Sequence, residues 1–517
     1  MKKLLVVGCC ITLLFGSGCS LDEPNYGSID NTNFYKQQSD IDYALTGAYL
    51  QLRMTWNEWA LNHYFIGDCN TDDALNGGKG ETDKKELFDL STFNVYSTNS
   101  YVSKRWQILY ALINRCNDVI YYAPEATGDQ ATLKRYMNEA KVLRAFGYYT
   151  LVTSFGDVPL FTAPLTPGQA SVTARTDKEV VYQQIIADLT DATDLPAKGE
   201  YPATDQYRVT SGLAKVLLGK VYMFRGDFVN AEKYLGEVVS SGKYNLLADY
   251  GFNWTKENEN SIESVFEIPN KVENKSVETG TNVPHYFTSR SNVPGYQGYG
   301  YHIPSQDLFA AFSPDDPRIT YVFTQTGDRY VGDEKAQDNS ISTTGYQDYK
   351  LTVPAIDKVG FDVWMISYNI RLIRYSDVLL LYAEALNENG KGGEALSHLN
   401  KVRQRARMTN PKDPRRDIQM YIPSTNTATS LPDIKTTDKV ELRSAIWHER
   451  RCELAMEGWR REDLLRQKRF GEVMKAYAAK YNTDKGANFN DNKDYLLPIP
   501  LSEIDKTNGL LTQNPSY

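Results

Sequence analysis

The sequence predicts a mainly α-helical protein in which a tetratricopeptide-like helical scaffold carries a second, loop-rich face of mixed α/β structure. Apolar residues recur at helical spacing in several long segments, and this period predicts the scaffold. Two of these segments also fit the pattern of large, small and aromatic positions of a tetratricopeptide helix pair. Between residues 245 and 370 the helical period stops, and Gly, Pro, Tyr, Asn and Thr surround short alternating stretches that are typical of strands.

The first helix pair is expected at residues 210–240. Leu218–Gly219 supplies the large and small positions of the template, Tyr222 supplies its aromatic position, and Ala231 and Leu235 supply the small and large positions of the second helix. These offsets predict two antiparallel helices that approach each other closely where the small residues lie.

The second helix pair is expected at residues 371–406, where a Gly-rich break at 387–393 separates two amphipathic segments. The small residues Ala383 and Ala395 would let the two backbones approach. Because residues 241–370 separate this pair from the first, we expect a helical scaffold that carries long insertions, and not a tandem solenoid in which repeats follow one another directly.

Further helical periods extend the scaffold along the chain, and Asp40 is expected to cap the first of them. These periods lie at residues 40–54, 106–121, 133–155, 177–195 and 440–477. The scaffold is therefore expected mainly within residues 40–54, 106–240 and 371–477, and the loop-rich insertion at about 245–370.

The N-terminus has the three parts of a secretory signal. Lys2 and Lys3 precede the apolar run Leu4–Phe15, and small residues lead up to Cys19. The apolar run is too short to span a bilayer. Because the signal ends at Cys19, it resembles the signal of a bacterial lipoprotein, in which that Cys becomes the acylated first residue. The alternative is a plain secretory signal with an incidental Cys, since Gly16 stands where such lipoproteins usually have Leu.

Charge and cysteine content exclude some classes of protein. The formal charge of -8 at pH 7 and the pI near 5.4 argue against a nucleic-acid-binding protein, which would need a basic face. Once the signal and its last Cys are set aside, Cys69, Cys116 and Cys452 remain, and their wide spacing fits neither a disulfide framework nor a zinc site. Cys116 and Cys452 are expected to be small core residues.

The acidic, Gly-rich loop at residues 68–78 invites comparison with a calcium-binding loop. Asp68, Asn70 and Asp72 have the first three spacings of an EF-hand, but Asp73 stands where its Gly should be, and the bidentate Glu is also missing. We therefore expect no EF-hand and no cofactor, and any calcium or magnesium ion would be structural.

Four blocks that follow one another along the chain are specific enough to indicate a family. They are Arg374–Ala385, Glu449–Arg466, Leu497–Ile504 and Gln513–Tyr517. Together they resemble the SusD/RagB-like outer-membrane nutrient-binding lipoproteins of Bacteroidetes. Asp22–Glu23 resembles the acidic tag that sends lipoproteins of this phylum to the outer face of the outer membrane. The resemblance covers essentially the whole mature chain, so we expect a lipoprotein signal peptide at 1–18 and one SusD-like domain at 19–517.

The resemblance implies a non-catalytic protein that captures glycans (oligosaccharides), or peptides in some members, for nutrient uptake. It also implies an outer-membrane lipid anchor at Cys19 that carries palmitate, a position facing the cell exterior, and delivery to a SusC-like TonB-dependent transporter. The loop-rich mixed α/β insertion then becomes the expected ligand-binding face. Charged residues of the second block, at three- and four-residue spacing on one predicted helix, are interpreted as a structural ion-pair network formed by Glu449, Arg450, Glu453, Glu457, Arg460, Arg461 and Asp463.

The chemistry of glycan binding suggests which residues to consider. Sugar rings offer apolar C–H faces that stack on aromatic rings, and their hydroxyl groups need fixed polar partners. The candidates for stacking are Tyr296, Tyr299, Tyr301, Trp56 and Trp59. The candidates for the hydroxyl groups are Asp72, Asp73, Asn76 and Arg290. The alternative for the aromatic runs Pro284–Phe287 and Tyr296–Tyr301 is that their rings only pack the inserted layer.

Two other functions compete with glycan capture. A glycoside hydrolase would need a pair of carboxyl groups at a defined separation, and the many Asp and Glu residues leave that open, although a helical scaffold with insertions does not favour it. His448-Glu449 lacks the second His of a metalloprotease helix. The second competitor is a scaffold that binds only proteins, as helical repeats commonly do. Capture of peptides in place of glycans also stays open.

Overall fold

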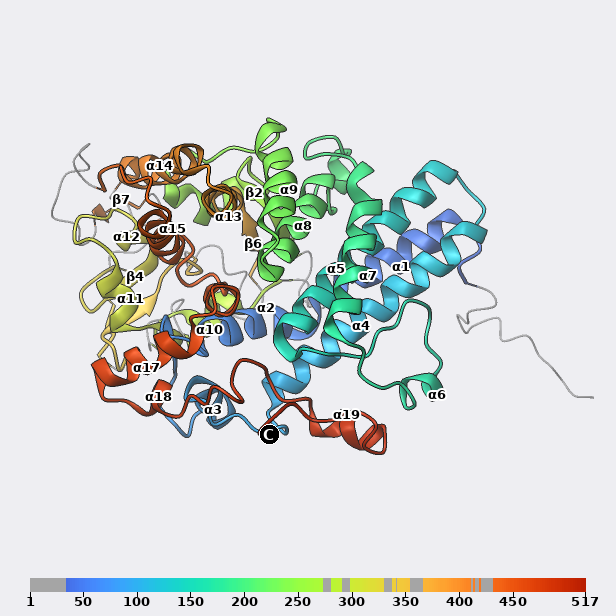
Figure 1. The fold of residues 1–517 in the computed structure, drawn as a ribbon, viewed down its shortest axis with the longest axis horizontal. Helices are drawn as coiled ribbons and strands as arrows, with labels where there is room; N and C mark the ends of the chain where they lie inside the picture. Colours follow the sequence, from blue (N-terminus) through green and yellow to red (C-terminus); the bar gives the residue numbers. More distant parts are fainter. Residues whose placement is uncertain are drawn as a thin grey trace, which may run out of the picture.

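Long helices laid side by side cross the molecule from α1 (Gln38–Gln51) to α15 (Lys439–Glu453), and short helices and strand pairs gather at the α15 end (Figure 1). This arrangement is that of a computed structural model, which describes residues 34–272, 280–290, 298–329, 337–340, 342–353, 366–410, 412–413, 418–419 and 431–517. The predicted fold class, a mainly α-helical scaffold with a loop-rich mixed face, is confirmed.

The helices of the scaffold pack mostly on their neighbours in the chain. They are α1, α2 (Met54–Tyr64), α4 (Ser100–Tyr122), α5 (Gln130–Phe155), α7 (Lys178–Asp191), α8 (Ser211–Arg225), α9 (Phe228–Ser240), α13 (Tyr375–Glu388), α14 (Gly392–Met408) and α15. The α4 helix packs against both α1 and α5, α5 packs against α7, and α7 packs against α8. Each helix therefore buries its apolar stripe against the next one.

The first predicted helix begins earlier than its sequence period suggests. It starts at Gln38, and Asp40 Oδ2 accepts hydrogen bonds from the backbone N–H groups of Lys36 and Gln37, at 3.0 and 2.9 Å. Asp40 is thus at position N3 of a capping box whose N-cap is Gln37, and it is not the N-cap residue that we predicted.

Both predicted helix pairs are present, as α8–α9 and α13–α14. A methyl group added at Gly219 would lie 2.5 Å from Leu235 Cγ, so the small position of the template is required for this contact. Helix α9 also packs against α13, and a methyl group at Gly236 would meet the Tyr382 ring at 3.2 Å. The two pairs are therefore adjacent in space, although a long insertion separates them in the sequence.

The second pair differs from its prediction at its start. Residues Ile370–Arg374 form the strand β6 and not the first turns of a helix, and all five are buried. Strand β6 pairs antiparallel with β2 (Ser264–Ile268), and the register places Ser264 opposite Arg374 and Ile268 opposite Ile370. This pairing holds the two ends of the insertion together directly before α13 begins at Tyr375.

The second face consists of short elements. Its strands are β1 (Ala74–Gly77), β3 (Tyr301–Pro304), β4 (Phe323–Gln325), β5 (Tyr346–Asp348), β7 (Lys412–Asp413) and β8 (Ile418–Gln419), which pair as β1–β3, β4–β5 and β7–β8. Its helices are α3 (Lys85–Ser91), α10 (Val283–Phe287), α11 (Gln306–Ala311) and α12 (Ile319–Val322).

The remaining elements connect these layers or follow them in the chain. The helices are α6 (Pro167–Ala170), α16 (Arg460–Arg466), α17 (Phe470–Tyr481), α18 (Asp484–Ala487) and α19 (Leu501–Lys506), and η1 (Phe65–Cys69) is a π-helical turn. The 3₁₀ turns are η2 (Ala123–Glu125), η3 (Ala192–Asp194), η4 (Ala203–Asp205), η5 (Tyr250–Trp254) and η6 (Lys256–Asn258).

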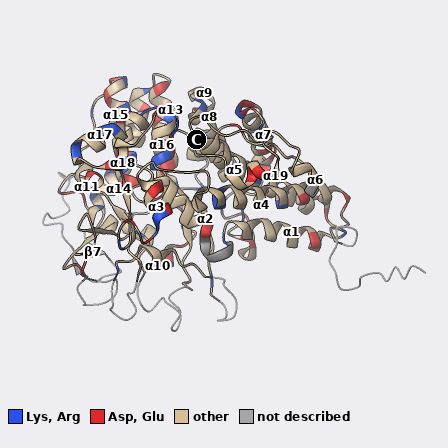
Figure 2. Ribbon diagram, turned by 90° about the horizontal axis from the view of Figure 1, so that it is seen from below, with Lys and Arg blue, Asp and Glu red and all other residues tan. Residues whose placement is uncertain are grey.

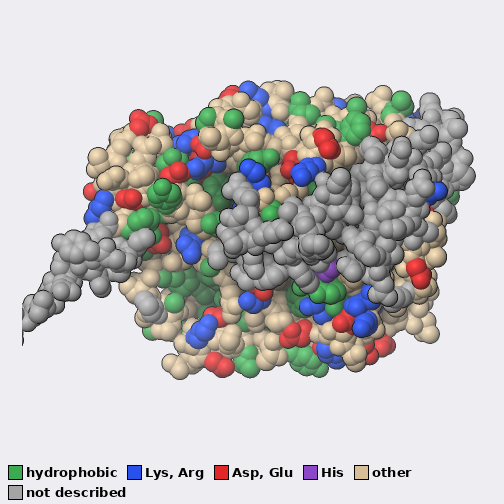
Figure 3. Space-filling view, turned by 180° about the vertical axis from the view of Figure 1, so that it is seen from behind, with side chains coloured by type: hydrophobic (Ala, Val, Ile, Leu, Met, Phe, Trp, Pro, Cys, Tyr) green, Lys and Arg blue, Asp and Glu red, His purple; other side chains and the backbone are tan. Residues whose placement is uncertain are grey.

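Charges of both signs are spread over the molecule. Basic and acidic residues are interspersed along α15 and α17 in Figure 2, and the face seen in Figure 3 mixes charged with apolar side chains where its residues are described. The expectation that the protein does not bind nucleic acid stays a prediction. Cys69, Cys116 and Cys452 are buried and free, as expected of core residues.

Candidate functional site

The β1–β3 pair brings the acidic loop next to the aromatic segment of the insertion. Its register places Gly77 opposite Tyr301 and Leu75 opposite Ile303. Gly77 has a φ of +76°, and a methyl group added there would lie only 2.2 Å from the Gly300 carbonyl oxygen. Only Gly allows this conformation and this close approach. The local sequence therefore determines that the two loops meet.

A cavity of about 320 Å³ opens where these loops meet. Asn76, Arg290 and Gln347 line it, together with the backbone of Gly78 and the side chain of Lys485. Arg290 Nη2 binds Asp83 Oδ2 at 2.8 Å, and Asn76 Nδ2 donates to the Gly77 carbonyl at 3.0 Å. The structure thus brings together two of the residues predicted to bind hydroxyl groups, Asn76 and Arg290.

Two further side chains of the cavity are held in place by backbone carbonyls. Gln347 Nε2 donates to the carbonyls of Phe287 and Tyr301, at 2.7 and 3.2 Å. Lys485 Nζ donates to the carbonyls of Cys69 and Ser91, and burial lowers the pKa of this amine to about 8. The cavity therefore presents fixed polar groups, which is what recognition of a neutral polar ligand requires.

Three tyrosine rings form an aromatic cluster next to this cavity. The ring centroids of Tyr286, Tyr299 and Tyr301 are 5.3 to 6.0 Å apart, and Lys84 Nζ lies 5.6 Å from the centroids of both Tyr286 and Tyr301. Tyr301 is buried, whereas Tyr286 and Tyr299 are half-buried. We did not nominate Tyr286 from the sequence, although the aromatic run Pro284–Phe287 contains it.

Three other predicted residues lie away from this site and are already engaged. Trp59 is 3% exposed, and its ring stacks on His63 with centroids 5.4 Å apart. Asp72 binds Arg451 and Arg460 at 2.8 Å, and Asp73 binds Arg451 at 2.7 Å, with both carboxylates buried. The burial of Trp59 and the ion pairs of Asp72 and Asp73 give these side chains a structural role and do not favour their nomination for ligand binding.

The charges around Asp72 also explain why this loop does not form a cation cage. Burial would raise the pKa of Asp72, but Arg451 and Arg460 outweigh it and hold the pKa below its usual value. Asp68 accepts hydrogen bonds from His302 Nε2 at 3.0 Å and from the Gly458 backbone at 2.8 Å. Within the described residues, no group of three or more His, Cys, Asp or Glu side chains is arranged to hold a metal ion.

The remaining nominations lie outside what the structure describes. These are Cys19, Tyr296 and the side chain of Trp56, which belongs to α2.

A buried histidine forms a polar triad behind the cavity. His302 Nδ1 lies 2.9 Å from Asp348 Oδ2, and Nε2 lies 3.0 Å from Asp68 Oδ2. Burial alone would lower the pKa of His302, but its hydrogen bonds to the two carboxylates raise it to about 9. The imidazole is fully buried and protonated at neutral pH, so it cannot act as a general base towards a bound ligand. It instead cross-links β3, β5 and η1.

The charges of the second sequence block are paired, with one exception, but not along one helix as predicted, because α15 ends at Glu453, α16 begins at Arg460 and most partners come from other elements. The residues of this block bind buried partners at 2.5 to 2.8 Å, as Glu449–Arg318, Glu453–Arg405, Glu457–Lys350, Arg450–Asp377, Arg460–Asp72 and Asp463–Arg466. The exception is Arg461, for which the structure shows no ion pair within the described residues. Its Nε donates to Asn70 Oδ1 at 3.1 Å and one terminal nitrogen to the Tyr495 carbonyl at 3.1 Å.

Two family models match this chain and together cover most of it. One, described as the SusD family, matches residues 262–517, and the other, described as "Starch-binding associating with outer membrane", matches residues 21–223. The chain belongs to the SusD family. The SusD-family match spans both the α13–α14 pair and the block that carries the ion-pair network.

Similar proteins extend over nearly the whole chain. SusD-like protein P2 of Formosa agariphila is 28% identical over 527 aligned positions, which cover 98% of each protein. A laminarin-binding SusD-like protein of known structure is 27% identical and superposes with a TM-score of 0.75, covering 93% of this chain and 100% of that one. Surface glycan-binding protein A from Bacteroides fluxus is 26% identical, with a TM-score of 0.76 and the same coverage.

These SusD-family comparisons support a glycan-binding protein associated with the outer membrane. Among the residues that the structure describes, no helix is both long enough and apolar enough to cross a membrane.

Proposed function

We propose that this SusD-family protein captures glycans at the outer face of the outer membrane without cleaving them, and delivers them to a SusC-like TonB-dependent transporter. The observation that carries the proposal is the tyrosine cluster next to a cavity with fixed polar groups. Tyr286 and Tyr299 supply half-buried rings for the C–H faces of sugars, and Asn76, Arg290 and Gln347 supply partners for hydroxyl groups.

Laminarin is the first glycan to test, because a relative of 27% identity carries its name. A chain that starts at Ser20 should retain laminarin oligosaccharides, or another glycan of a host, plant and microbial panel, in isothermal titration calorimetry. Reducing ends measured in the same samples should not increase. If the protein bound peptides but no glycan, the peptide-capturing alternative would be supported. Release of reducing ends would overturn the non-catalytic proposal.

The site can be tested with single substitutions. Aromatic contacts contribute about 0.5 to 1.5 kcal/mol each, so Tyr286→Ala and Tyr299→Ala should each weaken binding by roughly three- to tenfold. Arg290→Ala should weaken it as well. Tyr121→Ala is the matched control, because Tyr121 is 60% exposed near the end of α4 and should not affect binding. Unchanged affinity in all three site variants of a folded protein would place the glycan elsewhere.

The anchor and the partner need experiments in cells. Cys19 should carry the lipid, so incorporation of an alkyne-labelled palmitate should be lost in Cys19→Ala. The anchored protein should be accessible to protease added outside intact cells, and a TonB-dependent transporter should co-purify with it. Secretion into the medium with Cys19 unmodified would support the plain secretory signal instead.

A further inference from the structure

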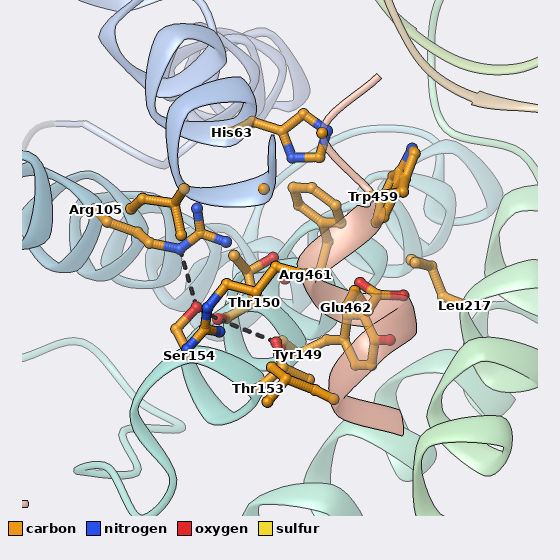
Figure 4. A pocket seen from close by; sticks show the side chains of 15 residues that line it. His63, Arg105, Tyr149, Thr150, Thr153, Ser154, Leu217, Trp459, Arg461 and Glu462 are labelled. Carbon is orange, nitrogen blue, oxygen red and sulfur yellow. Dashed lines mark hydrogen bonds between the residues drawn. The ribbon is translucent and has the colours of Figure 1, made fainter. Parts of the chain in front are cut away.

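A second cavity, of about 40 Å³, lies inside the helical scaffold and is separate from the proposed glycan site. Helix α4 contributes Arg105 to it, α5 contributes Ser154, α2 contributes His63, and α16 and the residue before it contribute Arg461 and Trp459. In Figure 4 the side chains of Arg105 and Arg461 lie next to Ser154, and those of His63 and Trp459 stand across the cavity. Two cationic groups, the half-buried Arg105 and the buried Arg461, therefore border one small space.

Both guanidinium groups have nitrogens without a partner. Arg105 Nε donates to Ser154 Oγ at 3.0 Å, and its two terminal nitrogens have no hydrogen-bond acceptor among the described residues. Arg461 is 4% exposed, and its Nε and one terminal nitrogen bind Asn70 and the carbonyls of Asp494 and Tyr495. The other terminal nitrogen of Arg461 has no hydrogen-bond acceptor among the residues that the structure describes. Arg105 is half-buried, so its terminal nitrogens can reach water or a ligand in the cavity, and a ligand that accepts hydrogen bonds would satisfy them.

The charge of this cavity is also unbalanced. Other buried arginines, such as Arg318 and Arg374, bind two or more carboxylates each, but neither Arg105 nor Arg461 is within ion-pair distance of a described carboxylate. Burial together with the charge of Arg461 lowers the pKa of Arg105 to about 9, and burial lowers that of Arg461 to about 10. At neutral pH both groups therefore still carry their charge.

The other polar groups around the cavity do not neutralise this charge. Glu462 lies at its edge, but its carboxylate binds Lys220 Nζ at 3.1 Å. His63 donates from Nε2 to the Glu457 carbonyl at 2.9 Å, and burial lowers its pKa to about 3, so the ring is neutral. The Ser154 hydroxyl donates to the Thr150 carbonyl at 2.7 Å. The lining therefore carries two positive charges against one carboxylate, which is itself paired with Lys220.

We propose that this cavity binds a small monovalent inorganic anion, of which chloride is the most abundant, between Arg105 and Arg461. The volume supports a small ligand, because a single water already needs roughly 10 to 15 Å³ of such space. The anion would join the helical scaffold, through α4 and α5, to α16. It would also act on the acidic loop, since Arg461 binds Asn70, the residue that follows η1 and precedes β1.

The experiment compares thermal unfolding of the chain from Ser20 in sodium chloride and in sodium gluconate of equal ionic strength, without any glycan. The midpoint should be on the order of 1 to 3 °C higher in chloride and should rise with the logarithm of its concentration, as for a ligand of the folded state. In Arg105→Met and Arg461→Met the difference between the two salts should disappear. In Arg175→Met it should persist, because Arg175 also binds only neutral acceptors but has all of its nitrogens engaged.

A crystal soaked in sodium bromide provides the second measurement and does not depend on a variant that folds. An anomalous peak between the two guanidinium groups is expected. Equal midpoints in both salts, or a bromide-soaked crystal with only water between Arg105 and Arg461, would overturn the proposal. Because no glycan takes part, either result leaves the glycan-binding experiment to be decided separately.

Discussion

Replacing Arg374 with Met should be among the most damaging single substitutions in this protein. Arg374 is 1% exposed and binds Glu263, Glu453 and Glu457 at 2.8, 3.0 and 2.7 Å. It belongs to a buried network that, within the described residues, balances five cations against five carboxylates. The members are Arg318, Lys350, Arg374, Arg403 and Arg405, with Asp316, Glu263, Glu449, Glu453 and Glu457.

Loss of one cation leaves this network with one uncompensated buried negative charge. Breaking a buried pair from one side typically costs 3 to 5 kcal/mol, so we expect Arg374→Met to lower the free energy of unfolding by about that amount. Equilibrium urea unfolding followed by Trp fluorescence measures it. Arg407→Met is the matched control. Arg407 lies in α14 and binds Asp433, which is half-exposed, and ion pairs of this kind contribute about 1 kcal/mol or less.

The dependence on pH tests the reason for the loss. Burial would raise the pKa of Glu453, but Arg405, Arg374 and Arg318 outweigh it and lower the pKa to about 2 in the intact network. That carboxylate stabilises the fold at neutral pH, and its contribution is lost only as the pH falls below the unfolded value towards 2. Without Arg374, a carboxylate of the network can take up a proton. The decrease in the free energy of unfolding that Arg374→Met causes should therefore be smaller at pH 5 than at pH 7. A loss below 1 kcal/mol at pH 7, or one that does not change with pH, would refute this reasoning.

Three further predictions concern other parts of the molecule. Gly77→Ala should destabilise the β1–β3 pair by about 1 to 3 kcal/mol and weaken glycan binding, as measured by urea unfolding and calorimetry, because φ is +76° and Gly300 is too close. Gly219→Leu should lower the unfolding midpoint more than Gly393→Leu, where the backbone is also helical but a side chain would meet open space. The pKa of His302 is about 9 in the folded protein and about 6.5 in the unfolded chain, so its contribution to stability is complete below pH 6.5. The free energy of unfolding in urea should therefore fall by roughly 3 kcal/mol from pH 6.5 to 9, and His302→Gln should not show this fall.

The scaffold could be predicted from the sequence because its signals are local. The apolar stripe of a helix repeats every three or four residues, and Gly219 faces Leu235 only a few turns later in the chain. The error at Ile370–Arg374 has the same origin. Five residues next to a strongly periodic helix cannot show their own period, and their pairing partner β2 lies more than a hundred residues earlier.

The site could be predicted only in part, because its contacts are distant in sequence. Asp83 and Arg290 are separated by 207 positions, and only the β1–β3 register brings them together. Asp72 looked like a free carboxylate in a polar loop, but its partner Arg460 lies 388 positions away. Residue type therefore nominated Asn76 and Arg290, which the fold places at one cavity, while the neutralisation of the loop carboxylates had no local signal.

The β2–β6 pair has a consequence for how this protein can diversify. Ladder hydrogen bonds between Ser264–Ile268 and Ile370–Arg374 fix the distance between the two ends of the intervening segment, whatever its length. Closing a flexible loop twice as long costs only about 0.6 kcal/mol more. Segments of quite different length and composition could therefore be exchanged between these two strands while α13 stays in place, provided that Arg318 and Lys350 keep their buried ion pairs with the scaffold. Specificity could then evolve without redesign of the helical scaffold.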